Sequence, residues 1–328
     1  MRRVRKFLLL FVGLFLWISP VSGEEPVVLG FLPGLGSLGD NAFNSLAYHG
    51  MIEAKRILHA RLLVKECRKI EEALPAAQSM LDRGVQVMVL NGYEYDDLAR
   101  QLASEYPEVR FILNEISWPG TENAVSLFYE GYQVAFLAGA LAGWTSQTGT
   151  VAVVAALSMP IIEEFINGFR DGLHEADPDT VLEVRYLSDT SDGFNMPNKG
   201  FEVATDLYRN EVDIILTLAG LSGNGIFDAA RREKGFCIGV DADQDHLARG
   251  HILTSLMKNV DKAIETVVLE ATRGDFQPGV RNMGLGDGMV GLTPMHFTRE
   301  IIGEEVLKKL EDLRESLFLK EEKEPLQP

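Results

Sequence analysis

The chain has 328 residues, 46% of them hydrophobic, and its 48 acidic against 31 basic side chains give a formal net charge of −17 at pH 7. This length and apolar content suffice for two domains with separate cores. So acidic a surface repels phosphate backbones and anionic lipid, which argues against nucleic-acid-binding and membrane-surface proteins.

The N-terminus has the features of an export signal. Basic residues Arg2, Arg3, Arg5 and Lys6 precede an apolar run over 7–18, and small residues follow up to Gly23. Spanning a bilayer takes about 20 apolar residues, so this run is typical of a signal peptide. We expect cleavage after Gly23 and a periplasmic protein without a lipid-anchor cysteine; an N-terminal membrane anchor is the alternative.

Short apolar runs alternate along the chain with segments of helical spacing. The expected strands are 27–32, 60–65, 85–90, 109–113, 123–128, 151–155, 181–186, 213–216 and 235–240. The expected helices are 42–58, 74–83, 95–106, 130–145, 161–175, 200–209, 226–234, 260–273 and 298–320. Continuous apolar runs are typical of parallel strands covered on both faces. The alternation predicts an α/β protein with two doubly wound lobes, since the series is too long for one small sheet.

Three segments are candidates for crossings between these lobes. They are the break at 118–121, the run 252–257 and the glycine-rich run 280–291. We expect an N-terminal lobe of residues 24–122 and 258–280, a C-terminal lobe of 123–257 and 281–320, and an acidic tail over 321–328. Three crossings indicate a hinge. The small-residue helix 130–145 is too short in its apolar part to span a membrane, so we expect it to pack closely inside a lobe.

The two cysteines, Cys67 and Cys237, have no metal-type spacing. We expect two separate buried thiols in different lobes, with a disulfide as the alternative. The acidic run 241–245 lacks the glycine and the distal glutamate of a calcium-binding loop, so no metal is expected.

A dinucleotide-type fingerprint, G-x-G-x-x-G, is formed by Gly34, Gly36 and Gly39 directly after the first strand. However, Asp40 stands at the helix terminus that should attract a pyrophosphate. The acidic residue expected about 20 positions on has no clean counterpart, since Glu66 lies about 30 positions beyond the fingerprint. We therefore expect no cofactor, and an NAD-dependent enzyme is disfavoured.

Polar side chains cluster instead where strands end. Asp40, Phe43 and Asn44 follow the first strand, and Asp241 follows the strand over 235–240. The carboxyl ends of parallel strands are where open α/β sheets bind small ligands. These positions predict a binding loop for a small polar molecule, with helix capping as the alternative for Asp241.

Five motifs in combination resemble the basic membrane protein family of purine-nucleoside receptors, which are substrate-binding components of ABC transporters. They are the segments 39–44, 136–139, 219–225, 238–244 and 253–261, and the similarity extends over about residues 27–294. The resemblance implies a type I periplasmic-binding-protein fold whose two lobes close on a nucleoside and perform no catalysis. It also implies a monomer that delivers its ligand to ABC transporter permease subunits.

The resemblance assigns roles to several residues. It implies that Phe43 and Phe194 stack on the two faces of the base, while Asp241 accepts bonds from the ribose hydroxyls. Lys258 would donate to the sugar or hold Asp241, and Gly220 would bring backbone close to the ligand. Ordinary core packing is the alternative for each ring.

The chain also departs from the family pattern. Gly34-Leu35 stands where the family has an Asp-Asn or Asp-Gly pair, and Asn114 stands where an aspartate usually ends the fourth strand. We expect Asp40 or Asn91 to take over base reading. A pentose or other sugar receptor and a small-molecule sensor are the alternatives within this fold, and a nucleoside hydrolase is the enzyme alternative.

Overall fold

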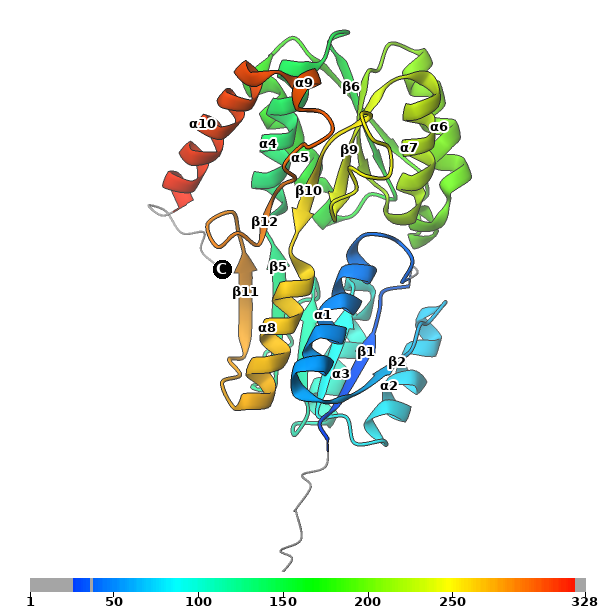
Figure 1. Cartoon of the computed structure of the whole chain (residues 1–328). Helices are drawn as coiled ribbons and strands as arrows, with labels where there is room; N and C mark the ends of the chain where they lie inside the picture. Colours follow the sequence, from blue (N-terminus) through cyan, green and yellow to red (C-terminus); the bar gives the residue numbers. More distant parts are fainter. Residues whose placement is uncertain (1–25, 36–37, 322–328) are drawn as a thin grey trace, which may run out of the picture.

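The computed structural model describes residues 26–35 and 38–321 and shows two lobes, each built on a six-stranded sheet flanked by helices (Figure 1). The predicted signal peptide, Gly36 of the glycine fingerprint and residues 322–328 of the acidic tail lie outside the described residues. The expected pair of doubly wound α/β lobes is confirmed.

The N-terminal lobe has the strand order β11-β5-β4-β3-β1-β2, and all its strand pairs are parallel. Its strands are β1 (Val28–Leu32), β2 (Arg61–Val64), β3 (Val87–Asn91), β4 (Arg110–Asn114), β5 (Ala124–Tyr129) and β11 (Gly279–Met283). Its helices are α1 (Phe43–Leu58), α2 (Ala73–Leu81), α3 (Asp96–Glu105) and α8 (Val260–Arg273). β3 is buried at every position, as a parallel strand covered on both faces must be.

Alternate residues of each strand face different helices in this lobe. Leu29 and Phe31 of β1 share a core with α1 and α8, whereas Leu32 packs with α2 and α3 on the opposite face. This sandwich holds the carboxyl ends of β1, β3 and β4 at one edge of the sheet.

The C-terminal lobe has the order β12-β10-β9-β8-β6-β7, with β12 antiparallel to β10. Its strands are β6 (Thr150–Ala155), β7 (Val181–Tyr186), β8 (Ile214–Leu218), β9 (Phe236–Asp241), β10 (Ile252–Lys258) and β12 (Val290–Leu292). Its helices are α4 (Gly131–Thr145), α5 (Pro160–Ala176), α6 (Pro197–Arg209), α7 (Gly223–Glu233), α9 (Arg299–Ile302) and α10 (Glu304–Glu321). The expected helix over 298–320 is divided into α9 and α10 because Gly303 adopts a left-handed φ of 84°.

The small-residue helix α4 packs against α5 with its backbone in close contact. A Cβ at Gly139 would collide with the carbonyl oxygen of Phe169, and one at Gly172 would collide with that of Phe136. Close packing inside a lobe is therefore confirmed as the use of this helix. Across the described residues, no helix combines the length and apolar character required to cross a membrane.

The chain crosses between the lobes after β5, between β10 and α8, and between β11 and β12. The first crossing thus follows Tyr129, rather than residue 122 where we expected it, because β5 pairs with β4 inside the first sheet. Residues 115–123 connect these strands without a helix, and the Trp118 indole donates to the Ala124 carbonyl oxygen at 3.1 Å. A Pro-Gly segment that looks like a linker is therefore a loop within one lobe.

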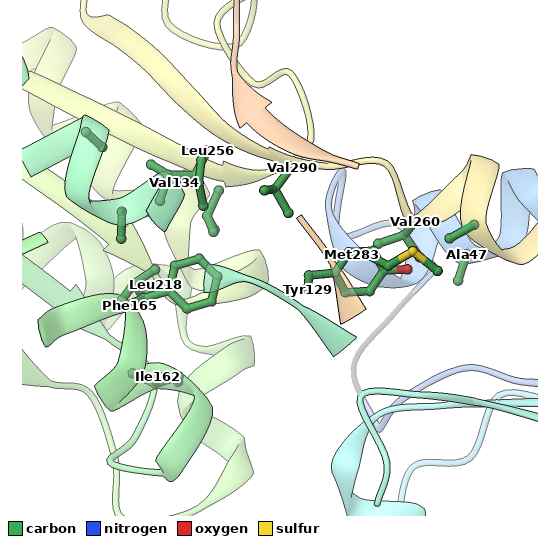
Figure 2. Packing of buried hydrophobic residues seen from close by; sticks show 14 of the residues in the cluster. Ala47, Tyr129, Val134, Ile162, Phe165, Leu218, Leu256, Val260, Met283 and Val290 are labelled. Atoms are coloured by element: carbon green, nitrogen blue, oxygen red, sulfur yellow. The ribbon is translucent and has the colours of Figure 1, made fainter. Parts of the chain in front are cut away.

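One apolar core continues through the crossings. Figure 2 shows Tyr129 and Met283, at the ends of β5 and β11, near Val260 at the start of α8. The same cluster includes Leu256 and Val290 of the second lobe. Cys67 and Cys237 are buried free thiols in separate apolar clusters, one in each lobe, as expected.

Candidate functional site

Lys258 joins the two lobes at the second crossing. It is the last residue of β10, and its Nζ donates to Glu115 Oε1 at 2.5 Å. The same Nζ lies 3.5 Å from Asp241 Oδ1 at the end of β9. Because Glu115 follows β4 of the first sheet, one ammonium connects carboxylates from both lobes.

Burial and charge act in opposite directions on this cluster. Burial alone lowers the pKa of Lys258, but Glu115 and Asp241 outweigh it, so the pKa is raised and the ammonium stays charged. Burial raises the pKa of Asp241 to about 6; Lys258 opposes this, whereas Glu115 and Asp40 add to it. Two carboxylates share one ammonium, which leaves one excess negative charge in a buried place.

Both carboxylates stand on left-handed backbone. The φ angle is 55° at Glu115 and 66° at Asp241. For a non-glycine residue this conformation costs on the order of 1–2 kcal/mol. Each residue directly follows or ends a strand, so the strained turns aim two acidic side chains at the crossing, a pattern that is common at ligand sites.

Three aromatic rings surround the same ammonium. The Nζ of Lys258 lies 5.6 Å from the centroid of Phe43, 5.7 Å from that of Tyr129 and 4.8 Å from that of Phe165. These distances are those of cation–π contacts. Since Phe43 belongs to α1 and Phe165 to α5, the rings also come from both lobes, and Phe43 shares its surroundings with Asp241.

Phe194 lies elsewhere in the second lobe. It belongs to a short 3₁₀ helix, Ser191–Asn195, and is half-buried. A Cβ at Gly220 would lie 3.2 Å from Phe194 Cδ1, so these two predicted site residues are in contact. Among the ring pairs of the described residues, none joins Phe43 to Phe194. Phe165 and Tyr129 are the rings that share Lys258 with Phe43.

Three predicted site residues form a buried chain of side-chain amides. Asn91 donates through Nδ2 to Asn44 Oδ1 at 2.8 Å, and Asn114 donates to Asn91 Oδ1 at 2.7 Å. The Tyr129 hydroxyl donates to Asn114 Oδ1 at 3.1 Å. Asn91 and Asn114 are paired directly across β3 and β4, which makes this contact a consequence of strand register. These hydrogen-bonded amides tie the first turn of α1, which carries Phe43, to the ends of β3 and β4.

Asp40 caps α1. Its Oδ1 accepts from the backbone N–H groups of Ala42 and Ser45 at 2.9 and 3.1 Å, and its Oδ2 accepts from that of Asn44 at 2.8 Å. This is the helix terminus that a pyrophosphate would need, and a carboxylate of the protein occupies it. Asp40 therefore holds the first turn on which Phe43 and Asn44 stand.

Four residues near this edge were not predicted from the sequence: Glu94, Glu115, Tyr129 and Phe165. Glu115 and Tyr129 lie at strand ends, which is a signal that could have found them. Glu94 and Phe165 gave no such signal, since Glu94 lies in the short 3₁₀ helix Tyr93–Tyr95 and Phe165 on the apolar face of α5. The part of the chain that the structure describes holds no group of three or more His, Cys, Asp or Glu side chains suited to a metal ion.

Comparison with solved structures identifies the fold. A solute-binding protein of an ABC transporter system from Aeropyrum pernix K1 matches with a TM-score of 0.82 at 21% identity, over 90% of this chain and 92% of that one. A second such protein, from Conexibacter woesei, matches with a TM-score of 0.71 at 21% identity, over 92% of this chain and 98% of that one. The expected periplasmic-binding-protein fold is confirmed.

Sequence comparison identifies the relatives. Basic membrane protein A of Borreliella burgdorferi is 28% identical over 296 residues, which cover 87% of this chain and 84% of that protein. A CD4+ T-cell-stimulating antigen of Listeria monocytogenes is 29% identical over 72% of this chain and 69% of that protein. The model of the Bmp family, described as ABC transporter substrate-binding protein PnrA-like, matches residues 31–326. The chain therefore belongs to the Bmp family of ABC transporter substrate-binding proteins, as its combined motifs indicated.

Proposed function

We propose that the protein captures a purine nucleoside between its lobes and delivers it to the permease subunits of an ABC importer. The observation that carries this proposal is the cluster around Lys258, which gathers Glu115 and Phe43 from one lobe and Asp241 from the other. A ligand at this place touches both lobes at once.

The charged part of the cluster suits a ribose. A carboxylate has two oxygens and accepts from both hydroxyls of a vicinal diol, and its charge strengthens those bonds. Lys258 gives its short bond to Glu115 and is farther from Asp241, at 3.5 Å. The Asp241 oxygens thus retain acceptor capacity for sugar hydroxyls, while Lys258 has further N–H donors for the sugar.

The aromatic part suits a flat base. Phe43 is half-buried on the first turn of α1, which Asp40 holds in place. Stacking of a base on such a ring contributes about 1–3 kcal/mol. Phe194 stands on the second lobe, and we propose that it approaches the other face of the base when the lobes close.

Closure follows from the three crossings. A ligand that contacts both lobes binds the closed state better than the open one, and this differential affinity shifts the equilibrium toward closure. The permease subunits would recognise the closed state. In this proposal the mature protein begins after Gly23 and acts in the periplasm as a monomer, without catalysis.

Isothermal titration of the mature protein against purine nucleosides, free bases and pentoses tests the proposal. Micromolar or tighter binding of a purine nucleoside, with weaker binding of the matching base and of ribose, supports it. Absence of binding by every nucleoside at millimolar concentration overturns it, and tighter binding of a pentose identifies a sugar receptor instead.

A further inference from the structure

Glu94 lies at the point where the strand order of the first sheet reverses. β1 is flanked by β2 on one side and β3 on the other, so the loops after β1 and β3 leave the sheet side by side. The Leu35 N–H, after β1, donates to Glu94 Oε1, after β3, at 2.6 Å. Open α/β sheets bind their ligands at this reversal point.

Glu94 is partly buried, and no cation among the described residues forms an ion pair with its carboxylate. None of the ion pairs within residues 26–35 and 38–321 includes Glu94. Burial raises its pKa, and the backbone N–H groups of Leu35 and of Glu94 itself oppose that rise. A carboxylate offers about four acceptor positions, so two neutral donors leave capacity for two more. Burying such an oxygen without donors is costly, which favours a ligand that supplies them.

The absence of a side chain at Gly34 makes room for the Glu94 carboxylate. A Cβ at position 34 would lie 3.0 Å from Glu94 Oε1 and 3.2 Å from Asn44 Oδ1. Glu94 therefore lies beside Asn44, the neighbour of Phe43 on α1. Phe43, the ring proposed to stack on the base, precedes Asn44 on the first turn of α1, so Glu94 borders the turn that carries this ring.

We infer that Glu94 accepts two adjacent N–H donors from the edge of the base, so that the protein selects guanine-type nucleosides over adenosine. Guanine presents neighbouring N1–H and N2–H donors, which match two carboxylate oxygens, whereas adenine presents an acceptor at N1. This inference rests on the proposed function and specifies its ligand class.

The test is isothermal titration of guanosine and adenosine with the wild-type protein and with Glu94→Gln. The glutamine keeps the shape but turns one acceptor into a donor, which then faces a donor of guanine. Guanosine affinity should fall about 10-fold or more, while adenosine affinity changes by less than about threefold. Asp96→Asn is the matched control, since Asp96 Oδ1 also accepts a backbone N–H, from Ser117 at 3.0 Å, and it should leave both affinities unchanged.

The outcomes separate the two ideas. Equal loss for both nucleosides means that Glu94 only ties two loops together, and this overturns the inference while the proposed function stands. Absence of nucleoside binding by the wild type overturns the proposed function itself. If circular dichroism shows Glu94→Gln unfolded, wild-type binding of 1-methylguanosine, which lacks the N1–H, decides: affinity at least about 10-fold below that of guanosine supports the inference, and a smaller difference overturns it.

Discussion

Lys258 Nζ and Glu115 Oε1 lie 2.5 Å apart although one residue ends a strand of the second sheet and the other follows a strand of the first. The residues are 143 positions apart in the chain. Both side chains are mostly buried, with 6% and 12% of their surface exposed. The pair therefore joins the two lobes directly at the second crossing.

Glu115→Gln should lower the thermal stability of the protein. Removing one partner of a buried ion pair leaves the other partly uncompensated, although Asp241 remains near Lys258. We expect a loss on the order of 1–3 kcal/mol, below the 3–5 kcal/mol of a fully uncompensated charge. Thermal unfolding followed by circular dichroism measures it. Glu122→Gln, at an exposed glutamate of the same connecting loop, is the control, and equal melting temperatures of the two variants would contradict the ion pair's role.

Asp241→Asn should stabilise the protein at neutral pH, measured without added ligand. Burial raises the pKa of Asp241 from 3.8 to about 6, so the folded state holds this proton more tightly than the unfolded chain. Stability from this group is complete below pH 4 and is lost as the pH rises through 6. Two pKa units correspond to about 3 kcal/mol, and we expect a gain of about 1–3 kcal/mol at pH 8.

The gain from Asp241→Asn should vanish at pH 4, where wild-type Asp241 is itself protonated. Urea unfolding of both proteins at pH 4 and pH 8 checks this dependence. A variant that is less stable than the wild type at pH 8 would show that the attraction of Lys258 exceeds the cost of burial. The same variant should lose nucleoside binding, because an amide has a single acceptor oxygen for the diol.

Asn91→Ala should destabilise the edge of the first sheet. The substitution removes the amide N–H that donates to Asn44 and the amide oxygen that accepts from Asn114. Two buried polar groups therefore lose a partner. At about 1–3 kcal/mol for each such group, we expect a loss of about 2–6 kcal/mol in urea unfolding. Asn210→Ala, which removes exposed bonds at the end of α6, is the comparison. A loss no larger than that of Asn210→Ala would be inconsistent with a cooperative amide chain.

Phe43→Leu should weaken nucleoside binding more than it weakens the fold. The ring is half-buried, and loss of base stacking should reduce affinity about 10-fold. Phe43→Tyr retains the aromatic face and should bind within about threefold of the wild type. Titration calorimetry of the two variants gives the comparison. Equal binding by Phe43→Leu and Phe43→Tyr would mean that Phe43 only fills the core.

The strands could be predicted closely because parallel strands covered on both faces leave uninterrupted apolar runs, as in 151–155 against the observed Thr150–Ala155. The position of the first crossing between the lobes could not be predicted, because β4 is followed by β5 without the intervening helix that the alternating pattern leads one to expect. The break at Gly303 was missed for a local reason, since its positive φ interrupts an otherwise continuous helical pattern.

The contacts of the candidate site could be predicted for residues that stand at or just after strand ends. Phe43, Asp241 and Lys258 meet as the strand-end rule and the resemblance indicated. Asn44, Asn91 and Asn114 also meet, but their bonds to one another follow from the register of β3 and β4, which no single strand reveals. Glu115 stands at a strand end, which is a signal that could have found it, but its bond to Lys258 of the second lobe could not be read from the sequence. Glu94 contacts the Leu35 N–H of a different connection, and no local pattern in the sequence indicated that contact.

A crystal structure of the mature protein grown with guanosine would show directly whether the ligand lies between the lobes. We expect one nucleoside in contact with both lobes, with its ribose hydroxyls on Asp241 and Lys258 and its base on the Phe43 ring. A nucleoside held by one lobe alone, or bound away from Lys258, would contradict the proposed function.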